Sequence, residues 1–184
     1  GRNRQGSYAE LEDLSSLYGF SIDRVPAQKL AEISVSSTKI RKAIREGDLL
    51  TAKSYLGYNF YFTSKVVRGL SIGSSIDYPT ANLQLSDKSK IQLGDGVYAV
   101  LVYIEGSRYF GMMNVGIRPT FEQSQHTVEV HIFDFQKDIY NINLKVVPLI
   151  KLRDEKKFEN LKLLKEQLQR DEVDARLFFS KKKL

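Results

Sequence analysis

Residues 97–115 read VYAVLVYIEGSRYFGMMNV, in which two apolar and aromatic runs stand on either side of Gly106. Such runs are typical of β-strands, and a glycine between them is typical of the turn that joins a hairpin. The same period-2 character extends in both directions along the chain, between turns rich in Gly, Pro, Asn and Asp. The candidate strands are Tyr61–Arg68, Val97–Glu105, Tyr109–Val115, Thr127–Phe135 and Asn143–Leu149.

Five or six strands without intervening helices predict a small, closed antiparallel barrel, because a doubly wound sheet would need crossover helices. Helices are predicted on either side of this region. Before it, the helical spacing of Tyr8, Leu11, Leu14 and Leu17 predicts a helix that ends at Gly19, and residues Phe20–Val25 predict a short strand. A second helix is predicted at Thr38–Glu46, capped by Ser37 and ended by Gly47. A third is predicted from Asp48 to Gly57. After it, Phe158, Leu161, Leu164 and Leu168 form one stripe, and Asp171 with Asp174 resembles the cap of a separate last helix.

Composition limits the class of protein. The chain has 184 residues, enough for one well-buried domain and a smaller appendage, and no apolar run long enough to cross a bilayer. It has no cysteine, which fits a reducing cytoplasm, and only His126 and His131 as histidines, which argues against zinc. The net charge of +6 is spread along the chain except at Lys181–Lys183. We therefore expect a cytoplasmic protein without a membrane or nucleic-acid partner.

A glycine-bearing loop, GLSIGSSIDYPTAN at 69–82, carries the first candidate site. Gly69 and Gly73 allow backbone amides to approach phosphate oxygens, and Thr80 and Asn82 supply neutral oxygens of the kind that Mg²⁺ accepts. The loop is not a Walker A motif, because no Gly-Lys-Ser/Thr follows. An ordinary turn between strands is the alternative interpretation of the same residues.

Glu129 is the second candidate. In residues 127–133 the side chains alternate, so Glu129 lies on the face opposite Val128, Val130 and Ile132. It is either a solvent-facing carboxylate or a group directed into a site. Phosphoryl transfer to an alcohol requires one such carboxylate, which accepts the proton of the attacking hydroxyl.

From about Phe60 to Arg176 the chain resembles the riboflavin kinase family, which phosphorylates riboflavin with ATP to make FMN. The matching motifs, in order, are the Gly69 loop with PTAN, GVYAV at 96–100, GIRPTF at 116–121, VEVHIFDF at 128–135, DIY at 138–140 and LRDEKKF at 152–158. The resemblance implies a six-stranded antiparallel Greek-key barrel with a helix packed outside it. It also implies ATP and riboflavin as substrates, Mg²⁺ as cofactor and FMN as product.

The resemblance also implies roles for individual residues. Glu129 would be the catalytic base, and Thr80 and Asn82 would bind Mg²⁺ and the ATP phosphates. The remaining ATP residues would be Gly69, Gly73, Ile132, Asp134 and Tyr140, and the flavin residues Arg153, Lys156 and Phe158. Two positions depart from the family: Ser74 replaces a usual basic residue and Asp77 a usual glycine, which would weaken ATP binding.

Residues 1–57 resemble the end of the FMN adenylyltransferase domain that precedes the kinase in bacterial bifunctional FAD synthetases. The matches are GRNRQG at 1–6 and ISVSSTKIR at 33–41, whose Ser36, Ser37, Thr38 and Arg41 fall where that family contacts ATP phosphates. Here we favour a capped helix start, because the His-containing nucleotide motif of that domain is absent. The predicted domains are a remnant of an α/β nucleotidyltransferase at 1–57 and a kinase barrel at 58–184. FMN adenylyltransferase activity is expected of the parent protein and not of this chain alone.

Two other functions stay open beside riboflavin kinase. A catalytically weakened flavin- or nucleotide-binding regulatory domain would account for Ser74 and Asp77. A barrel that binds single-stranded nucleic acid would account for the pI near 9.4 and for the 10 Phe and 10 Tyr residues. Oligomeric state is not indicated by the sequence.

Overall fold

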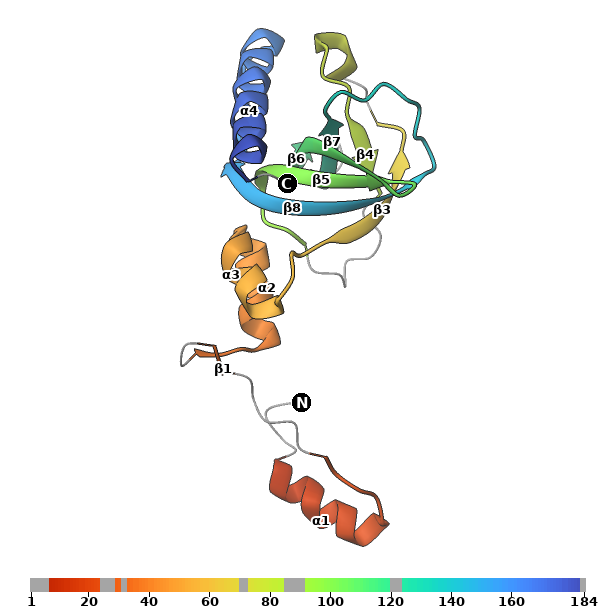
Figure 1. The fold of residues 1–184 in the computed structure, drawn as a ribbon, viewed down its shortest axis with the longest axis vertical. Coiled ribbons are helices and arrows are strands. Elements are labelled where there is room, and N and C mark those ends of the chain that lie inside the picture. Colours follow the sequence, from red (N-terminus) through yellow and green to blue (C-terminus); the bar gives the residue numbers. More distant parts are fainter. Residues whose placement is uncertain are drawn as a thin grey trace. The chain divides into compact units, whose positions relative to one another are not determined.

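Six antiparallel strands close into a barrel in the computed structural model of the protein, which describes residues 7–23, 29–30, 33–69, 73–84, 92–119 and 124–182 (Figure 1). They are β3 (Phe62–Val67), β4 (Ala81–Leu83), β5 (Gly96–Ile104), β6 (Ser107–Pro119), β7 (Ser124–Ile132) and β8 (Asn143–Arg153). Their order around the barrel is β3-β4-β7-β6-β5-β8. The predicted antiparallel barrel is confirmed, and β4, at the end of the Gly69–Asn82 segment, completes it.

Strand β5 is buried on both faces, which explains its nearly continuous apolar sequence. Tyr98, Val100 and Val102 point into the cluster that fills the barrel. Ala99 and Leu101 belong to a second cluster outside the barrel, together with residues of helix α4 (Leu161–Lys182). Strands of a sheet alternate their side chains, so a strand with apolar neighbours on both sides needs apolar residues at every position.

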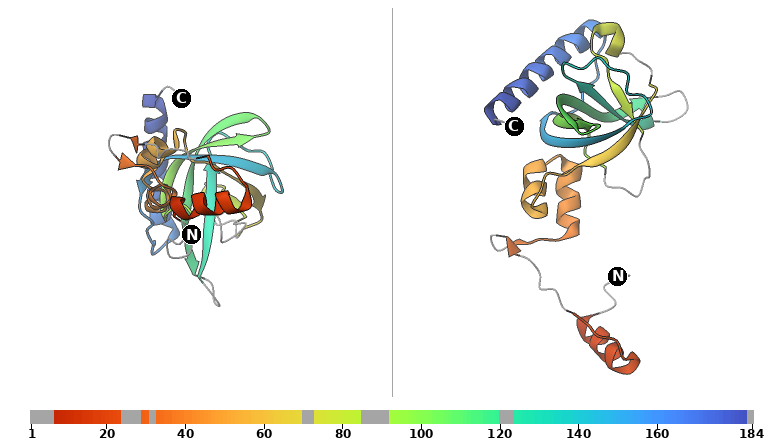
Figure 2. Two further views of the ribbon diagram at one scale, coloured as in Figure 1. Left: turned by 90° about the horizontal axis from the view of Figure 1, so that it is seen from below. Right: turned by 45° about the vertical axis from the view of Figure 1, so that its right-hand side comes forward.

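Helix α4 lies against the outer face of the barrel (Figure 2). Its Phe179 stacks on Phe110 of β6 with the ring centroids 4.4 Å apart. The predicted separate last helix is wrong, because α4 runs unbroken for 22 residues through Asp171. Asp171 is buried, and its carboxylate pairs with Arg153 of β8 and does not cap a helix. Among the described residues, no helix combines the length and apolar character that crossing a bilayer requires.

Two short helices pack against the interior cluster of the barrel. Helix α2 (Ser37–Glu46) begins after Ser36, whose side chain accepts a hydrogen bond from the Lys39 amide at 3.3 Å. The N-cap is thus one residue before the predicted Ser37. Helix α3 (Leu49–Leu56) begins after Asp48, as predicted. Gly47 and Gly57 end the two helices with φ of 75° and 80°, in the left-handed region that glycine favours.

The chain divides into two compact units, Gly1–Val35 and Ser36–Leu184. The first contains α1 (Tyr8–Tyr18), which ends at Gly19 as predicted, and the hairpin of β1 (Lys29–Leu30) and β2 (Ile33–Ser34). The predicted strand Phe20–Val25 is wrong for residues 20–23, and its last two residues lie outside the described part. Helices α2 and α3 belong to the same unit as the barrel, so the boundary between the compact units follows Val35 and not residue 57. The predicted domains, an adenylyltransferase remnant at 1–57 and a kinase barrel at 58–184, are defined by resemblance to two families and stay a prediction.

Gly94 marks the contact between α2 and the barrel. Its amide donates to the carbonyl of Ile44 at 3.3 Å, and a Cβ atom at this position would overlap the carbonyl oxygen of Arg45. We expect Gly94→Ala to destabilise the fold by about 1–3 kcal/mol, the usual cost of overpacking. That corresponds to a Tm lower by roughly 2–12 °C in thermal unfolding. Lys53→Ala, at an exposed site of α3, is the control, and a wild-type Tm for Gly94→Ala would contradict the docking of α2.

Candidate active site

The pairing of β4 with β7 brings Thr80, Asn82 and Glu129 together. Asn82 is the register partner of Glu129 across the two strands, and Thr80 directly precedes β4. The Thr80 hydroxyl donates a hydrogen bond to Glu129 Oε2 at 3.1 Å. All three side chains are half-buried. Two neutral oxygen groups and one carboxylate thus lie together at one place on the barrel. Asn82 and Glu129 are 47 residues apart in the sequence.

A cavity of about 470 Å³ opens beside this group. Val130 and Ile132 line it from β7, Thr80 lines it from just before β4, and residues 135–140 line it from the β7–β8 connection. Of the residues predicted to contact ATP, Thr80, Ile132 and Tyr140 therefore share one cavity. Directly after β3, Arg68 has its Cζ atom 5.1 Å from the Tyr140 ring centroid. The volume and the mixed lining suit a small polar ligand.

The two loop glycines are needed for close packing. A Cβ atom at Gly69 would overlap the side-chain amide of Asn82, and one at Gly73 would overlap the carbonyl oxygen of Tyr78. The Tyr78 amide also donates to the Gly73 carbonyl at 2.8 Å, in a hydrogen bond that spans the 3-10 turn Gly73–Ile76. Glycine at these positions thus allows Gly69 to lie close to Asn82 of β4, and Gly73 to lie close to Tyr78.

Asp77, one of the two departures from the family pattern, has a structural explanation. Its φ is 65°, in the left-handed region where glycine is favoured and Asp is tolerated. Its carboxylate accepts a hydrogen bond from Lys165 of α4 at 2.6 Å. The added negative charge is thus paired with a cation. The side chain of Ser74, the other departure, lies outside the described part of the chain.

His131 fixes the backbone just before Thr80. Its Nδ1 lies 2.8 Å from the carbonyl oxygen of Pro79, and because a carbonyl only accepts, Nδ1 carries the proton. The imidazole also packs on the Tyr78 ring, with the centroids 5.1 Å apart. The alternation of β7 places His131 on the face of Glu129, but nothing in the sequence indicates its contact with Pro79.

Arg153 and Phe158, two of the predicted flavin residues, lie together at the end of β8. The Arg153 guanidinium donates to both carboxylate oxygens of Asp171, at 2.8 and 2.7 Å, and its Cζ lies 5.8 Å from the Phe158 ring centroid. Gln167 donates to Asp171 as well, at 2.8 Å. Lys156 is exposed on the turn between them. Asp171 was not among the predicted site residues, because its partner lies 18 residues away in the sequence.

Asp134 follows β7, and its side chain contacts α4. Both of its carboxylate oxygens accept hydrogen bonds from Arg176, at 3.1 Å each. Hydrogen bonding to this guanidinium lowers the pKa of Asp134. Asp134 is thus not one of the residues that line the cavity, and its predicted contact with ATP stays a prediction.

At the start of α2, Ser36 serves as the helix cap and Ser37 accepts a hydrogen bond from Arg41 at 3.2 Å. Thr38 is exposed on the first turn of the helix. These contacts agree with a capped helix start.

The family model described as "Riboflavin kinase" matches residues 56–179. The bifunctional riboflavin kinase/FMN adenylyltransferase of Escherichia coli K12 is 36% identical over 180 residues, 97% of this chain and 57% of the relative. The protein of the same name from Bacillus subtilis is 36% identical over 149 residues, 79% of this chain and 47% of the relative. The chain thus spans about half the length of these relatives.

Among solved structures, one from Streptococcus pneumoniae, described as a macrolide-efflux protein, superposes with a TM-score of 0.77 at 38% identity. The superposition covers 90% of this chain and 54% of that one. This likeness concerns the fold.

Proposed function

We propose that this chain, which belongs to the riboflavin kinase family, transfers the terminal phosphoryl group of ATP to the 5′-hydroxyl of riboflavin. A bond forms between the hydroxyl oxygen and the γ-phosphorus, the bond from that phosphorus to the bridging oxygen breaks, and FMN and ADP result. The observation that carries this proposal is the Thr80–Glu129 hydrogen bond beside the cavity, with Asn82 in register.

Glu129 is the proposed base. A carboxylate within reach of the attacking hydroxyl can accept its proton as the new bond forms. Glu129 is half-buried and accepts the Thr80 hydroxyl at 3.1 Å, so an alcohol can take up a similar position against it. The strand pairs with Asn82 on one side and Asn114 on the other hold its backbone in place.

Thr80 and Asn82 are the proposed ligands of Mg²⁺. A hydroxyl and a side-chain carbonyl are hard oxygen donors, and a site with few protein ligands leaves room for water and phosphate, as this ion prefers. When bound, Mg²⁺ neutralises phosphate charge. Gly69 and Gly73 keep the loop close to these two residues, and the described amides nearby can donate to phosphate oxygens.

The cavity is the proposed place of the nucleotide, with Ile132 and Tyr140 on its walls. Asp134 directly precedes Phe135, which lines the cavity, but is not itself a lining residue. The flavin is proposed to lie against Arg153, Lys156 and Phe158. In this arrangement Asp171 orients the Arg153 side chain, and Phe158 offers an apolar surface next to it.

The wider assignment follows from the bifunctional relatives. We expect the parent protein to phosphorylate riboflavin and then to adenylylate FMN to FAD, while this chain alone performs the first step. Its substrates are then small molecules of the cytoplasm. The pairing of Asp77 with Lys165 favours an active kinase over a weakened regulatory domain, because it reduces the repulsion of phosphate by Asp77.

The test is direct. Incubated with ATP, Mg²⁺ and riboflavin, the chain is expected to produce FMN, measured by chromatography. EDTA in excess over Mg²⁺ is expected to reduce FMN formation by about 100-fold or more, since the phosphate charge is then not neutralised. Flavin binding without FMN formation would support the regulatory-domain alternative instead.

A further inference from the structure

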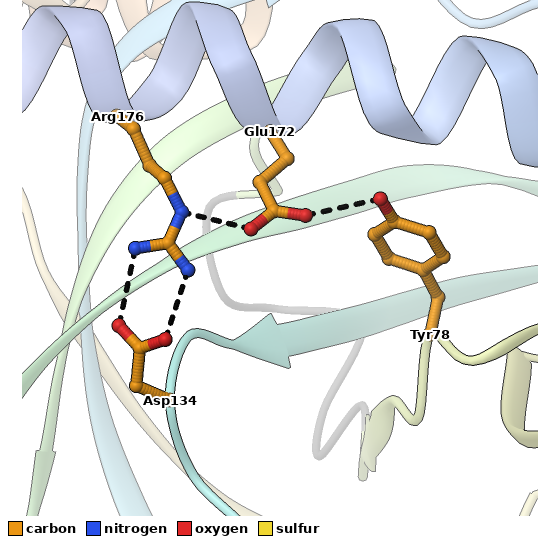
Figure 3. A network of polar contacts seen from close by, with 4 residues as sticks. All are labelled: Tyr78, Asp134, Glu172 and Arg176. Carbon is orange, nitrogen blue, oxygen red and sulfur yellow. Dashed lines mark hydrogen bonds and ion pairs between the residues drawn. The ribbon is translucent and has the colours of Figure 1, made fainter.

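Four side chains form one polar network between α4 and the barrel: Tyr78, Asp134, Glu172 and Arg176 (Figure 3). Arg176 donates two hydrogen bonds to Asp134, each 3.1 Å long, and one from Nε to Glu172 Oε1 at 2.8 Å. The other oxygen of Glu172 accepts the Tyr78 hydroxyl at 3.0 Å. Arg176 also lies over the Phe133 ring, with its Cζ 4.5 Å from the centroid.

The network reaches the cavity at two points. Tyr78 immediately precedes Pro79, which begins one wall, and Asp134 immediately precedes Phe135, which begins the other. These two anchors are 56 residues apart in the sequence and come from different loops. Arg176 and Glu172 lie one helical turn apart on α4 and bond to each other. Arg176 binds Asp134 and Glu172 binds Tyr78, so the pair links the two anchors.

The anchors are well fixed. Tyr78 is buried, and burial together with its bond to Glu172 raises the pKa of its hydroxyl to about 12, so it stays a donor at neutral pH. Asp134 has a φ of 57°, a left-handed conformation that a non-glycine residue rarely adopts. The sharp turn that this φ produces directs residues 135–140 along the cavity. The two bonds from Arg176 hold the residue that makes this turn.

We propose that Arg176 is a positioning residue for the nucleotide, because it fixes the distance between the two walls of the cavity through Asp134 and through Glu172 and Tyr78. This proposal rests on the proposed function. It predicts an effect on ATP binding rather than on the chemical step. Glu129 and Asn82 are held by strand pairing, in which Arg176 takes no part.

Steady-state kinetics of the whole chain test the proposal. Arg176→Ala is expected to raise the KM for ATP on the order of 10-fold, as the walls lose their spacing, while kcat changes less than about threefold. The affinity for ADP, measured by calorimetry, is expected to fall by the same factor. Arg176→Lys keeps the charge but not the planar fork that reaches both carboxylates, so it is expected to restore only part of the loss.

Arg170→Ala is the matched control. Arg170 is an exposed arginine of the same helix, without a hydrogen bond or ion pair to any described residue, and its replacement is expected to leave the KM unchanged. Asp134→Asn removes the charge but tolerates the left-handed φ, and combined with Arg176→Ala it is expected to be little worse than Arg176→Ala alone. If Arg176→Ala lowers Tm but keeps the wild-type KM for ATP and affinity for ADP, Arg176 is merely structural. If the wild-type chain makes no FMN, the proposed function fails instead.

Discussion

Replacing Glu129 with glutamine is expected to lower kcat on the order of 100- to 10,000-fold, the range that a positioned base contributes. The amide keeps the shape of the side chain, and its oxygen can still accept the Thr80 hydroxyl, which lies 3.1 Å from Glu129 Oε2. What it loses is the ability to take up a proton. Riboflavin affinity, measured by flavin fluorescence, is therefore expected to stay close to that of the wild type.

Glu105→Gln provides the control for this variant. Glu105 is exposed in the turn between β5 and β6, and the same chemical change there is expected to leave kcat as it is. FMN formation by Glu129→Gln within a few-fold of the wild-type rate would exclude Glu129 as the base. A loss of riboflavin affinity equal to the loss of kcat would point to a disturbed site.

Asp171→Asn is expected to cause the largest loss of stability. Asp171 is 2% exposed, and its carboxylate accepts two hydrogen bonds from Arg153 and one from Gln167. An amide would turn its NH₂ group toward the guanidinium and leave that cation without a counter-charge. Breaking a buried pair in this way costs about 3–5 kcal/mol. A Tm lower by roughly 6–20 °C in thermal unfolding is the expected result.

The control for this change lies on the same helix. Asp174 is exposed three residues further on, and Asp174→Asn is expected to shift Tm by no more than about 1–2 °C, as surface substitutions do. Because Asp171 orients Arg153, riboflavin affinity at a temperature well below Tm is expected to fall in Asp171→Asn alone. Equal Tm values for the two variants would contradict the structural role of the buried pair.

The hairpin of β5 and β6 could be predicted because its signal is local: long apolar runs separated by Gly106. Strand β4 could not, since three residues are too few to display a period. The unbroken course of α4 could not be predicted either, for a different reason. Asp171 and Asp174 look alike in the sequence, and only the folded barrel places Arg153 beside the first of them.

The same distinction applies to the candidate site. Thr80, Asn82 and Glu129 could be named because their motifs resemble those of a family, and the structure then brought them together. Tyr78, His131 and Arg176 carried no such signal. Their partners lie in other elements, so their importance depends on how the barrel and α4 meet.

We expect the barrel to open most easily at strand β4. Within the described residues, β4 pairs in register with β3 at two positions, Val66 with Leu83 and Val67 with Asn82, and the Gln84 amide adds one bond to the Lys65 carbonyl. By contrast, β5 and β6 pair along the full length of β5. Local unfolding proceeds where few hydrogen bonds must break. The amides of Ala81–Leu83 should therefore exchange with solvent well before those of β5. This shortest strand pairing involves the strand that carries Asn82, so we expect local opening to reach the candidate site while the other strands stay paired.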